Sequence, residues 1–454
     1  MEIENSFFGT EKVWKILFKL APPVMLAQLV QAMYNIVDSY FVGQISNDGL
    51  NALSVIFPLQ LLIMALGIGT GVGVNTVMAR MYGQQNPRAA EEVAGTGTLL
   101  AVCSWAVFAF LSFVFMGFYA DISAESQEVS RLAVTYGNIV CVGSLGMFLE
   151  SCWTKIHQAR GNMKRPMVAQ VSGALVNIVL DFVLIFGVGD FIPAMGVAGA
   201  AIASVIGQFV AAFIVFPGGS GKLPTIGKRK FANADADGSL ESVASYIKQI
   251  YRAGIPSIVM QALYTVYIMG LNLILVSFSD AAVTALGLYY KLQTFFFIPI
   301  FGFETCIVPV ISYNYAIGST ARCRKILWDS CVFGMVFMLV GIVGFEFFPC
   351  QLIGLFSDDS LVMEIGVTAF RRIGLSFLPA VFSLLIPVFF QALEMGKESL
   401  AVTLLRQIVL LVPVAWALSF AGLDYVWFTF PISEILTCVL GLILYIRLYR
   451  KWEM

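Results

Sequence analysis

Long apolar runs dominate the pattern of hydrophobic and polar positions, and short polar or charged segments separate them. A helix needs about 20 apolar residues to cross the roughly 30 Å hydrocarbon core of a bilayer. The expected spans cover residues 14–41, 50–79, 93–118, 130–153, 166–187, 193–217, 248–278, 283–313, 326–349, 361–391, 400–420 and 424–447. The pattern therefore predicts an all-α integral membrane protein with 12 transmembrane helices.

The amino-acid composition also indicates a protein that is surrounded mainly by lipid. Of the 454 residues, 59% are hydrophobic and only 12% are charged, whereas about 25% of residues are charged in a soluble globular protein. The mean hydropathy is +0.85. A net charge of −1 gives no reason to expect nucleic acid as a partner,. The lipid bilayer is the expected environment.

Charged residues orient the spans. Loops on one side of the twelve-span arrangement are rich in Lys and Arg, and those on the other side carry acids with almost no basic residues. Basic residues expected on the first side include Lys12, Arg80, Lys164, Lys228, Arg324, Lys397, Arg406 and Arg450. Cytoplasmic loops carry the excess of Lys and Arg. Both chain termini are therefore predicted to be cytoplasmic.

The two halves of the sequence repeat each other without gaps. Aligned pairs lie 233 positions apart and include Pro23 with Pro256, Gln28 with Gln261, Tyr34 with Tyr267 and Gln60 with Gln293. An even number of spans per repeat gives both halves the same orientation, as in parallel-repeat transporters. We expect two pseudo-symmetric six-helix bundles, residues 1–217 and 248–454, joined by a cytoplasmic linker at 218–247.

Two acids lie deep within predicted spans of the first half, Asp38 in span one and Asp181 in span five. Intramembrane acids are expensive and mark functional sites by default. Polar residues expected at the same depth are Tyr34, Tyr136, Asn177 and Ser204. Such a group suits binding of a proton, or of a sodium ion through its oxygens. The alternative is that the two acids cap helix ends at the outer interface.

The repeat does not duplicate these acids. Asp38 aligns with Leu271, and Asp181 aligns with Val414. An ion site built on the two acids would therefore belong to the N-terminal bundle alone.

Further charges within the second-half spans indicate a substrate-binding region. Lys291 either lines a cavity or extends toward the outer interface. Glu304 and Glu434 are candidates for binding cationic substrate. The candidate cleft residues are Lys291, Glu304, Phe295, Tyr290, Gln261 and Tyr264.

The sequence shows no cluster of residues that is typical of a catalytic site. The only histidine, His157, is expected in a basic cytoplasmic loop, which leaves no His-based triad,. The cysteines show no metal-ligand spacing and are interpreted as reduced packing residues. We expect no enzymatic activity, no cofactor and no dedicated metal centre other than the possible sodium site at Asp38 and Asp181.

Several strings resemble the multidrug and toxic compound extrusion (MATE) family, close to its MepA-like bacterial branch. They are APPVMLAQLVQAMYNIVDSYFVGQ in span one, RPMVAQVSGALVNIVLDFVLIFG in span five, GVAGAAIASVIGQ, LGLYYKLQTFFFIPIFGF, PVISYNYAIG and QALEMGKESLAVTLLRQ. The resemblance runs over nearly the whole chain.

This resemblance implies the MATE fold of the MOP superfamily, in which two bundles form a V-shaped cleft. It implies a monomer in the bacterial inner membrane that exports bulky, often cationic organic compounds in exchange for H⁺ or Na⁺. The family's ion network maps onto Tyr34, Asp38, Tyr136, Asn177 and Asp181. Ser204 stands where many members carry Thr. Pro23 matches the proline at which span one is proposed to bend.

Two other functions remain open on the same scaffold. A flippase for lipid precursors or polysaccharide would have a cleft rich in basic residues, and an exporter of one narrow class of metabolite would share most features of a drug exporter. A receptor or a membrane enzyme would need a sensor domain or a catalytic cluster, and the sequence shows neither.

Overall fold

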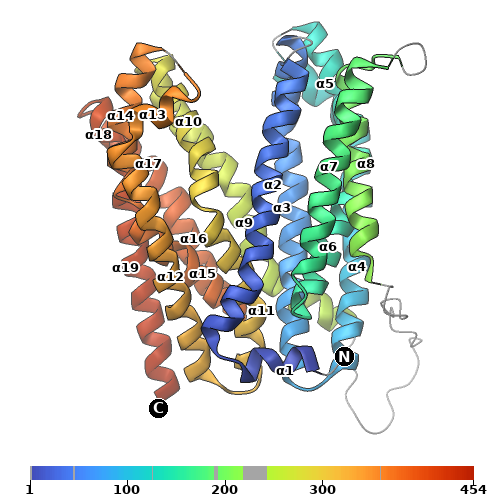
Figure 1. The fold of residues 1–454 in the computed structure, drawn as a ribbon, viewed down its shortest axis with the longest axis vertical. Helices are drawn as coiled ribbons and strands as arrows, with labels where there is room; N and C mark the ends of the chain where they lie inside the picture. The colour runs from blue at the N-terminus through green and yellow to red at the C-terminus, as the bar shows by residue number, and fades with distance from the viewer. Residues whose placement is uncertain are drawn as a thin grey trace. The chain divides into compact units, whose positions relative to one another are not determined.

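The computed structural model describes residues 3–43, 47–124, 126–188, 193–217, 243–357 and 359–453, and nearly all of this chain is helical (Figure 1). The first half contains α1 (Ile3–Thr10), α2 (Val13–Gly43), α3 (Asn47–Gly83), α4 (Pro87–Ser123), α5 (Gln127–Val142), α6 (Leu145–Ala159), α7 (Lys164–Phe186) and α8 (Val197–Val215). Most of the predicted linker 218–247 lies outside the described residues, and its last five residues already belong to the next helix.

The second half begins with a long helix that starts before the predicted span. Its elements are α9 (Val243–Val276), α10 (Asp280–Phe296), α11 (Ile298–Ala316), α12 (Thr320–Phe347), α13 (Pro349–Gly354), α14 (Ser360–Gly374), α15 (Phe377–Ala392), α16 (Gly396–Leu404), the π-helical turn η2 (Leu405–Leu410), α17 (Leu411–Ser419), α18 (Leu423–Val426) and α19 (Thr429–Glu453).

The number of membrane crossings agrees with the sequence prediction. Within the described residues, nine helices are long and apolar enough to cross a membrane, and three bent helix pairs raise this number to as many as 12. The all-α, twelve-span prediction is confirmed.

Two of the bent pairs lie at matching places in the repeat. The α5–α6 pair bends by 41° near Ser144, and the α14–α15 pair bends by 56° near Ser376. At each bend the serine hydroxyl donates to a carbonyl three residues earlier, to Cys141 O at 2.7 Å and to Ile373 O at 2.6 Å. These bonds satisfy carbonyls at a helix end, where no water is available in the hydrocarbon.

The described chain forms two compact units. The first unit consists mainly of Leu26–Gln261, and the second consists of Phe7–Met25 and Ala262–Met454. The chain therefore changes unit inside α2 and again inside α9, a short distance after Pro23 and Pro256. Proline removes a helical hydrogen bond and so weakens the helix at these places. The predicted bundle boundaries at 217 and 248 stay a prediction.

Close packing of α7 on α8 positions the polar residues of the first unit. A Cβ atom added to Gly173 would lie 2.8 Å from Gly207 O, and one added to Gly207 would lie 2.8 Å from Gly173 O. Only glycine allows this approach of the two backbones. One turn after Gly173, Asn177 therefore lies directly against α8.

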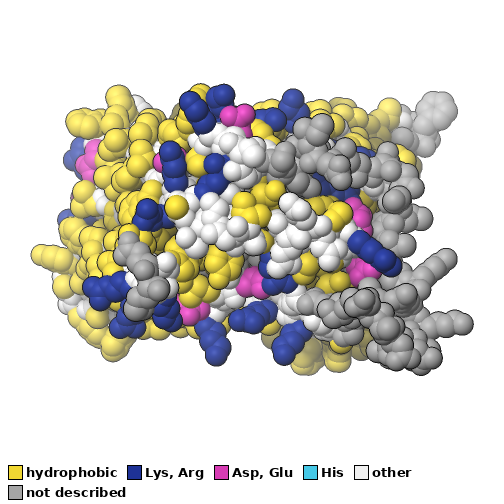
Figure 2. Space-filling model, turned by 90° about the horizontal axis from the view of Figure 1, so that it is seen from below, with side chains coloured by type: hydrophobic (Ala, Val, Ile, Leu, Met, Phe, Trp, Pro, Cys, Tyr) yellow, Lys and Arg dark blue, Asp and Glu magenta, His cyan; other side chains and the backbone are white. Residues whose placement is uncertain are grey.

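Basic side chains gather on the end of the molecule seen in Figure 2. In the first unit, Arg160 Nη2 contacts both carboxylate oxygens of Glu91, at 2.8 and 3.0 Å. Arg165 donates to the last carbonyls of α8, from Nε to Ile214 O at 2.7 Å and from Nη2 to Phe216 O at 2.9 Å. Cations at a helix C-terminus satisfy its free carbonyls.

The expected loop position of His157 is wrong. His157 lies within α6, is 5% exposed, and its Nε2 atom is 3.0 Å from Val215 O at the end of α8. The helix continues past the predicted boundary at residue 153 to Ala159, which buries the imidazole between elements. The histidine has a packing role.

Candidate functional site

A fully buried carboxylate lies in the C-terminal half of α7. Asp181 has no exposed surface, and Asn177, one helical turn earlier, is 3% exposed. A carboxylate without water needs hydrogen-bond partners or a bound cation to remain charged. The environment of Asp181 is thus that of a group whose protonation or ion binding has a large energetic effect.

Asn177 connects this carboxylate to α8. With its amide oriented to satisfy both neighbours, the Asn177 nitrogen lies 3.3 Å from Asp181 Oδ2, and its oxygen accepts from the backbone N–H of Ser204 at 3.1 Å. The structure therefore brings together three of the predicted ion-site residues, Asp181, Asn177 and Ser204. Asn177 thus contacts both the carboxylate of Asp181 and the backbone of α8.

Tyr136 is hydrogen-bonded to a residue of α3, a helix from which no ion-site residue was predicted. It lies in α5, is 2% exposed, and its hydroxyl accepts from Gln60 Nε2 of α3 at 3.2 Å. A glutamine within an apolar span, repeated as Gln293 in the second half, was the available signal for this residue.

The remaining predicted ion-site residues lie on α2. Tyr34 is half-buried, whereas the side chain of Asp38 lies outside the described part of the structure. The grouping of Tyr34, Asp38 and Tyr136 with Asp181 therefore stays a prediction.

The second unit contains a buried ion pair that the charge pattern of the sequence did not predict. Arg406 was counted with the basic residues of the cytoplasmic side, although it falls within the predicted span 400–420, and it lies in η2 inside a membrane-crossing segment. Its Nη2 atom is 2.6 Å from Glu434 Oε1 in α19, and its Nε atom is 2.9 Å from the same oxygen. Ser383 of α15 also donates to Glu434 Oε2. Glu434 thus already has a cation, which argues against its expected role as a binding group for cationic substrate.

Arg406 lies deeper in span eleven than the predicted start at residue 400 indicated, because the span begins at Gly396. The span contains a π-helical turn between Leu405 and Leu410. π-Helical turns are rare and occur frequently at functional sites. The available signal was an arginine followed by an apolar run, together with an acid in the next span.

Two of the candidate cleft residues belong to a tyrosine cluster, which we define as Tyr264, Tyr267, Tyr289 and Tyr290. Ring centroids are 5.3 Å apart for Tyr264 and Tyr267, 6.1 Å for Tyr264 and Tyr290, and 5.1 Å for Tyr289 and Tyr290. Tyr289 also lies 5.2 Å from Phe430, one turn before Glu434 in α19. The cluster therefore adjoins the helix that carries Glu434.

The other candidate cleft residues are dispersed. Lys291 is exposed, and its Nζ atom lies 5.9 Å from the ring centroid of Phe356. Phe295 in α10 and Glu304 in α11 are half-buried. Gln261 belongs to the first unit, unlike the rest. Their common membership of a cleft stays a prediction.

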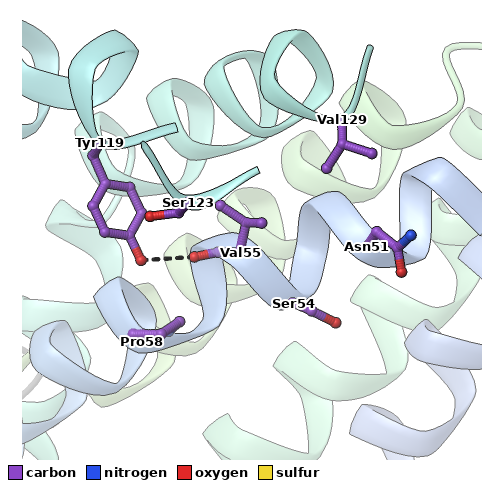
Figure 3. A pocket seen from close by; sticks show the side chains of 7 residues that line it. All are labelled: Asn51, Ser54, Val55, Pro58, Tyr119, Ser123 and Val129. Atoms are coloured by element: carbon purple, nitrogen blue, oxygen red, sulfur yellow. Dashed lines mark hydrogen bonds between the residues drawn. The ribbon is translucent and has the colours of Figure 1, made fainter. Parts of the chain in front are cut away.

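A cavity of about 330 Å³ opens in the first unit between α3, α4 and α5 (Figure 3). Its lining residues are Asn51, Ser54, Val55, Pro58, Tyr119, Ser123 and Val129. Tyr119 donates its hydroxyl to Val55 O at 2.8 Å, close to the helix irregularity at Pro58. Among the side chains that the structure describes, the residues that line this cavity include none of the predicted site residues.

Membrane-crossing helices in two repeats, with ionisable groups buried inside them, define a multi-pass membrane protein. The sequence model of the MatE family matches residues 23–183 and, a second time, residues 256–417. The chain belongs to the MatE family. Its two matches begin at Pro23 and Pro256, the pair that aligns in the internal repeat, which confirms the two-fold organisation. Members of this family are transporters, and the chain is not an enzyme.

Characterised relatives cover almost the whole chain. A FAD transporter from Shewanella oneidensis is 24% identical over 93% of this chain and 92% of its own length. The multidrug export protein MepA of Staphylococcus aureus is 23% identical over 98% of this chain and 96% of its own. Small organic molecules are thus the class of substrate among these relatives.

A solved structure has the same fold. It is a MOP-superfamily transporter from Pyrococcus furiosus, whose binding pocket is described as having reverse polarity that suggests a different function. It superimposes with a TM-score of 0.90, covers 99% of this chain and 98% of its own, and is 21% identical. The predicted MATE fold is confirmed.

Proposed function

We propose that this protein is a secondary multidrug exporter that moves bulky, often cationic organic compounds out of the cell in exchange for H⁺ or Na⁺. The observation that carries the proposal is the fully buried Asp181, hydrogen-bonded by Asn177, which also contacts α8. In the second half this position is Val414, so the acid is not required by the repeated fold. Relatives that export drugs support the substrate class.

The coupling ion binds in the first unit. Asp38 and Asp181 share the ion, and Tyr34, Tyr136, Asn177 and Ser204 supply further oxygens or orient the acids. Binding of a cation neutralises the buried carboxylate and lowers the cost of keeping it away from water. The first unit then favours a different packing of α7 on α8, which is linked to drug release outside.

Pro23 serves as the hinge for this change. The chain passes from the second unit to the first between Met25 and Leu26, within two residues of Pro23. A helix bends most easily where proline has removed a hydrogen bond. Bending here allows the outer part of α2, which carries Asp38, to move while its inner part stays in the second unit.

The proposed setting is a monomer in a bacterial inner membrane with both termini in the cytoplasm. The basic face in Figure 2 then faces the cytoplasm, as the distribution of Lys and Arg requires,. Moving one elementary charge inward supplies about 2.3 kcal/mol per 100 mV of membrane potential. The ion gradient adds to this driving force.

Efflux of a cationic dye from drug-sensitive bacteria that lack their main pumps tests the proposal. Cells expressing the protein are expected to export ethidium. The proton gradient and the sodium gradient are collapsed in separate experiments, and collapse of the gradient of the coupling ion is expected to stop export. Asp38→Asn should abolish export at equal membrane expression. Full export by Asp38→Asn, or no export by well-expressed wild type, would overturn the proposal.

A second candidate is export of one class of metabolite. The FAD transporter among the relatives favours it, since its sequence aligns with 93% of this chain and 92% of its own length. A panel of drugs that all fail as substrates, together with export of a flavin nucleotide, would favour this candidate.

A further inference from the structure

The second unit contains a group of charged and aromatic residues to which the proposed function assigns no role. Its parts are the Arg406–Glu434 pair and the neighbouring tyrosine cluster. In the first half, Arg406 aligns with Gly173 and Glu434 with Ala201. The pair is therefore no requirement of the repeated fold, and its burial needs a reason of its own.

Stabilisation of the fold is by itself a weak explanation for the burial of the Arg406–Glu434 pair. The side chains of Arg406 and Glu434 are only 13% and 5% exposed. Removing two charges from water costs several kcal/mol per ion, and well-packed apolar residues often replace such a pair without loss of stability. Intramembrane ion pairs commonly mark substrate or ion pathways.

The arginine retains unused donors. Its bonds to Glu434 come from Nε and Nη2. Nη1, on the other edge of the guanidinium, donates to no group in the described part of the chain. Arginine presents five N–H groups in a rigid fork suited to oxyanions. Glu434 and Ser383 therefore position Arg406, and the open edge remains available to a ligand.

The tyrosine cluster supplies an apolar surface and a second donor. Tyr264 exposes 37% of its surface, and its ring lies edge-on to those of Tyr267 and Tyr290. The Tyr290 hydroxyl is buried, and the ring of Tyr267 lies beside it with centroids 6.4 Å apart. A phenol hydroxyl can donate as well as accept, so it can donate to an oxyanion.

The two parts are close enough to act on one ligand. Tyr289 contacts Phe430, which lies one turn before Glu434 in α19, and Glu434 pairs with Arg406. Flat rings pack on tyrosine edges and faces, and a guanidinium edge accepts an oxyanion. An aromatic ligand that carries one negative group fits both.

We infer that Arg406 and the tyrosine cluster form a substrate subsite for aromatic organic anions, with Arg406 binding the carboxylate, sulfonate or phosphate and the tyrosines binding the ring. This inference rests on the proposed function, because it names a substrate class of the same exporter. It extends that class from cationic compounds to aromatic compounds with an anionic group.

Two dyes with the same xanthene ring test it. Fluorescein is anionic at neutral pH and rhodamine 6G is cationic. Binding of each dye is measured by fluorescence anisotropy with the purified full-length protein in nanodiscs, and empty nanodiscs serve as the blank for partition into lipid. The wild type is expected to bind both dyes.

The main variant replaces both charges, Arg406→Gln with Glu434→Gln, so that no unpaired charge is left buried. It is expected to weaken fluorescein binding about tenfold or more, the scale of a charged hydrogen bond, and to leave rhodamine 6G within about threefold. Tyr290→Phe keeps the ring and should weaken fluorescein alone, by a smaller factor. Arg372→Gln is the matched control, since Arg372 pairs with Asp424 at the surface of the same unit.

Unchanged fluorescein binding in the double variant would overturn the inference, and so would a wild type that binds rhodamine 6G but not fluorescein. The second result would leave the proposed cationic drug export intact. A wild type that binds neither dye would contradict both proposals. Asp181→Asn separates them further, since it should abolish ion-driven transport yet retain fluorescein binding.

Discussion

Asn177 lies between Asp181 and Ser204, with its amide nitrogen 3.3 Å from Asp181 Oδ2 and its oxygen 3.1 Å from the Ser204 backbone nitrogen. A single side chain thus connects a buried acid of α7 to the backbone of α8. Because Asp181 is fully buried, the cost of its charge depends on such contacts,. This is the most direct route by which ion binding can change helix packing in the first unit.

Asp181→Asn should abolish the response to ion gradients without loss of the fold. The substitution is isosteric and removes the charge, so no buried charge is left unpaired. Dye uptake into proteoliposomes under imposed proton or sodium gradients measures the effect. Asp121→Asn is the control, because Asp121 is an exposed acid of the same unit that accepts from Ser130 Oγ at 2.7 Å. Gradient-driven uptake by Asp181→Asn equal to that of Asp121→Asn would exclude Asp181 from coupling.

Tyr136→Phe should raise the ion concentration needed for half-maximal transport. The change removes the hydroxyl bonded to Gln60 and costs about 1 kcal/mol of stability,. Tyr119→Phe removes a comparable bond, to Val55 O at 2.8 Å, outside the ion site. Ion titrations of both variants compare the two. Equal shifts, or none, would indicate that Tyr136 only stabilises the fold.

Pro23→Ala should slow transport while leaving ion and dye binding close to wild type. Alanine restores the missing helical hydrogen bond and stiffens α2 near the point where the chain changes unit,. Pro22→Ala is the adjacent control, at an exposed position of the same helix. The transport rate is measured at saturating dye for both variants. Equal rates for the two variants would contradict the role of Pro23 as the hinge.

Single substitutions in the Arg406–Glu434 pair should destabilise the protein more than the double substitution does. Removing one partner leaves a buried charge and costs about 3–5 kcal/mol. The double glutamine variant leaves no buried charge. Its loss in free energy of unfolding should be well below the sum of the losses in the two single variants. Denaturant unfolding of the purified protein measures this, and additive effects would show that the two side chains do not interact.

Sequence patterns predicted the number of membrane-crossing helices well, because a helix that crosses the bilayer needs a long apolar run,. The repeat was equally accessible, since Pro23, Gln28 and Tyr34 each recur at a matching position. Depth within the spans also selected Asp181, Asn177 and Ser204, which the structure brings together.

The failures concern residues near span ends. Arg406 was counted with the basic residues of the cytoplasmic side, whereas it lies in the π-helical turn of span eleven and pairs with Glu434, which no simple periodicity reveals. His157 was misplaced because α6 continues to Ala159. Pairings between distant helices, such as Arg406 with Glu434 and Gln60 with Tyr136, depend on tertiary packing that a single sequence does not encode in any local pattern.

Substrate-driven ion movement tests the central claim most directly. Proteoliposomes are loaded with a cationic dye, no ion gradient is imposed, and internal pH and sodium are followed as the dye leaves. The account predicts that dye efflux drives protons or sodium ions inward in the wild type, and that the Asp38→Asn, Asp181→Asn double variant moves neither ion. Dye efflux by the wild type without any opposing ion movement would contradict it.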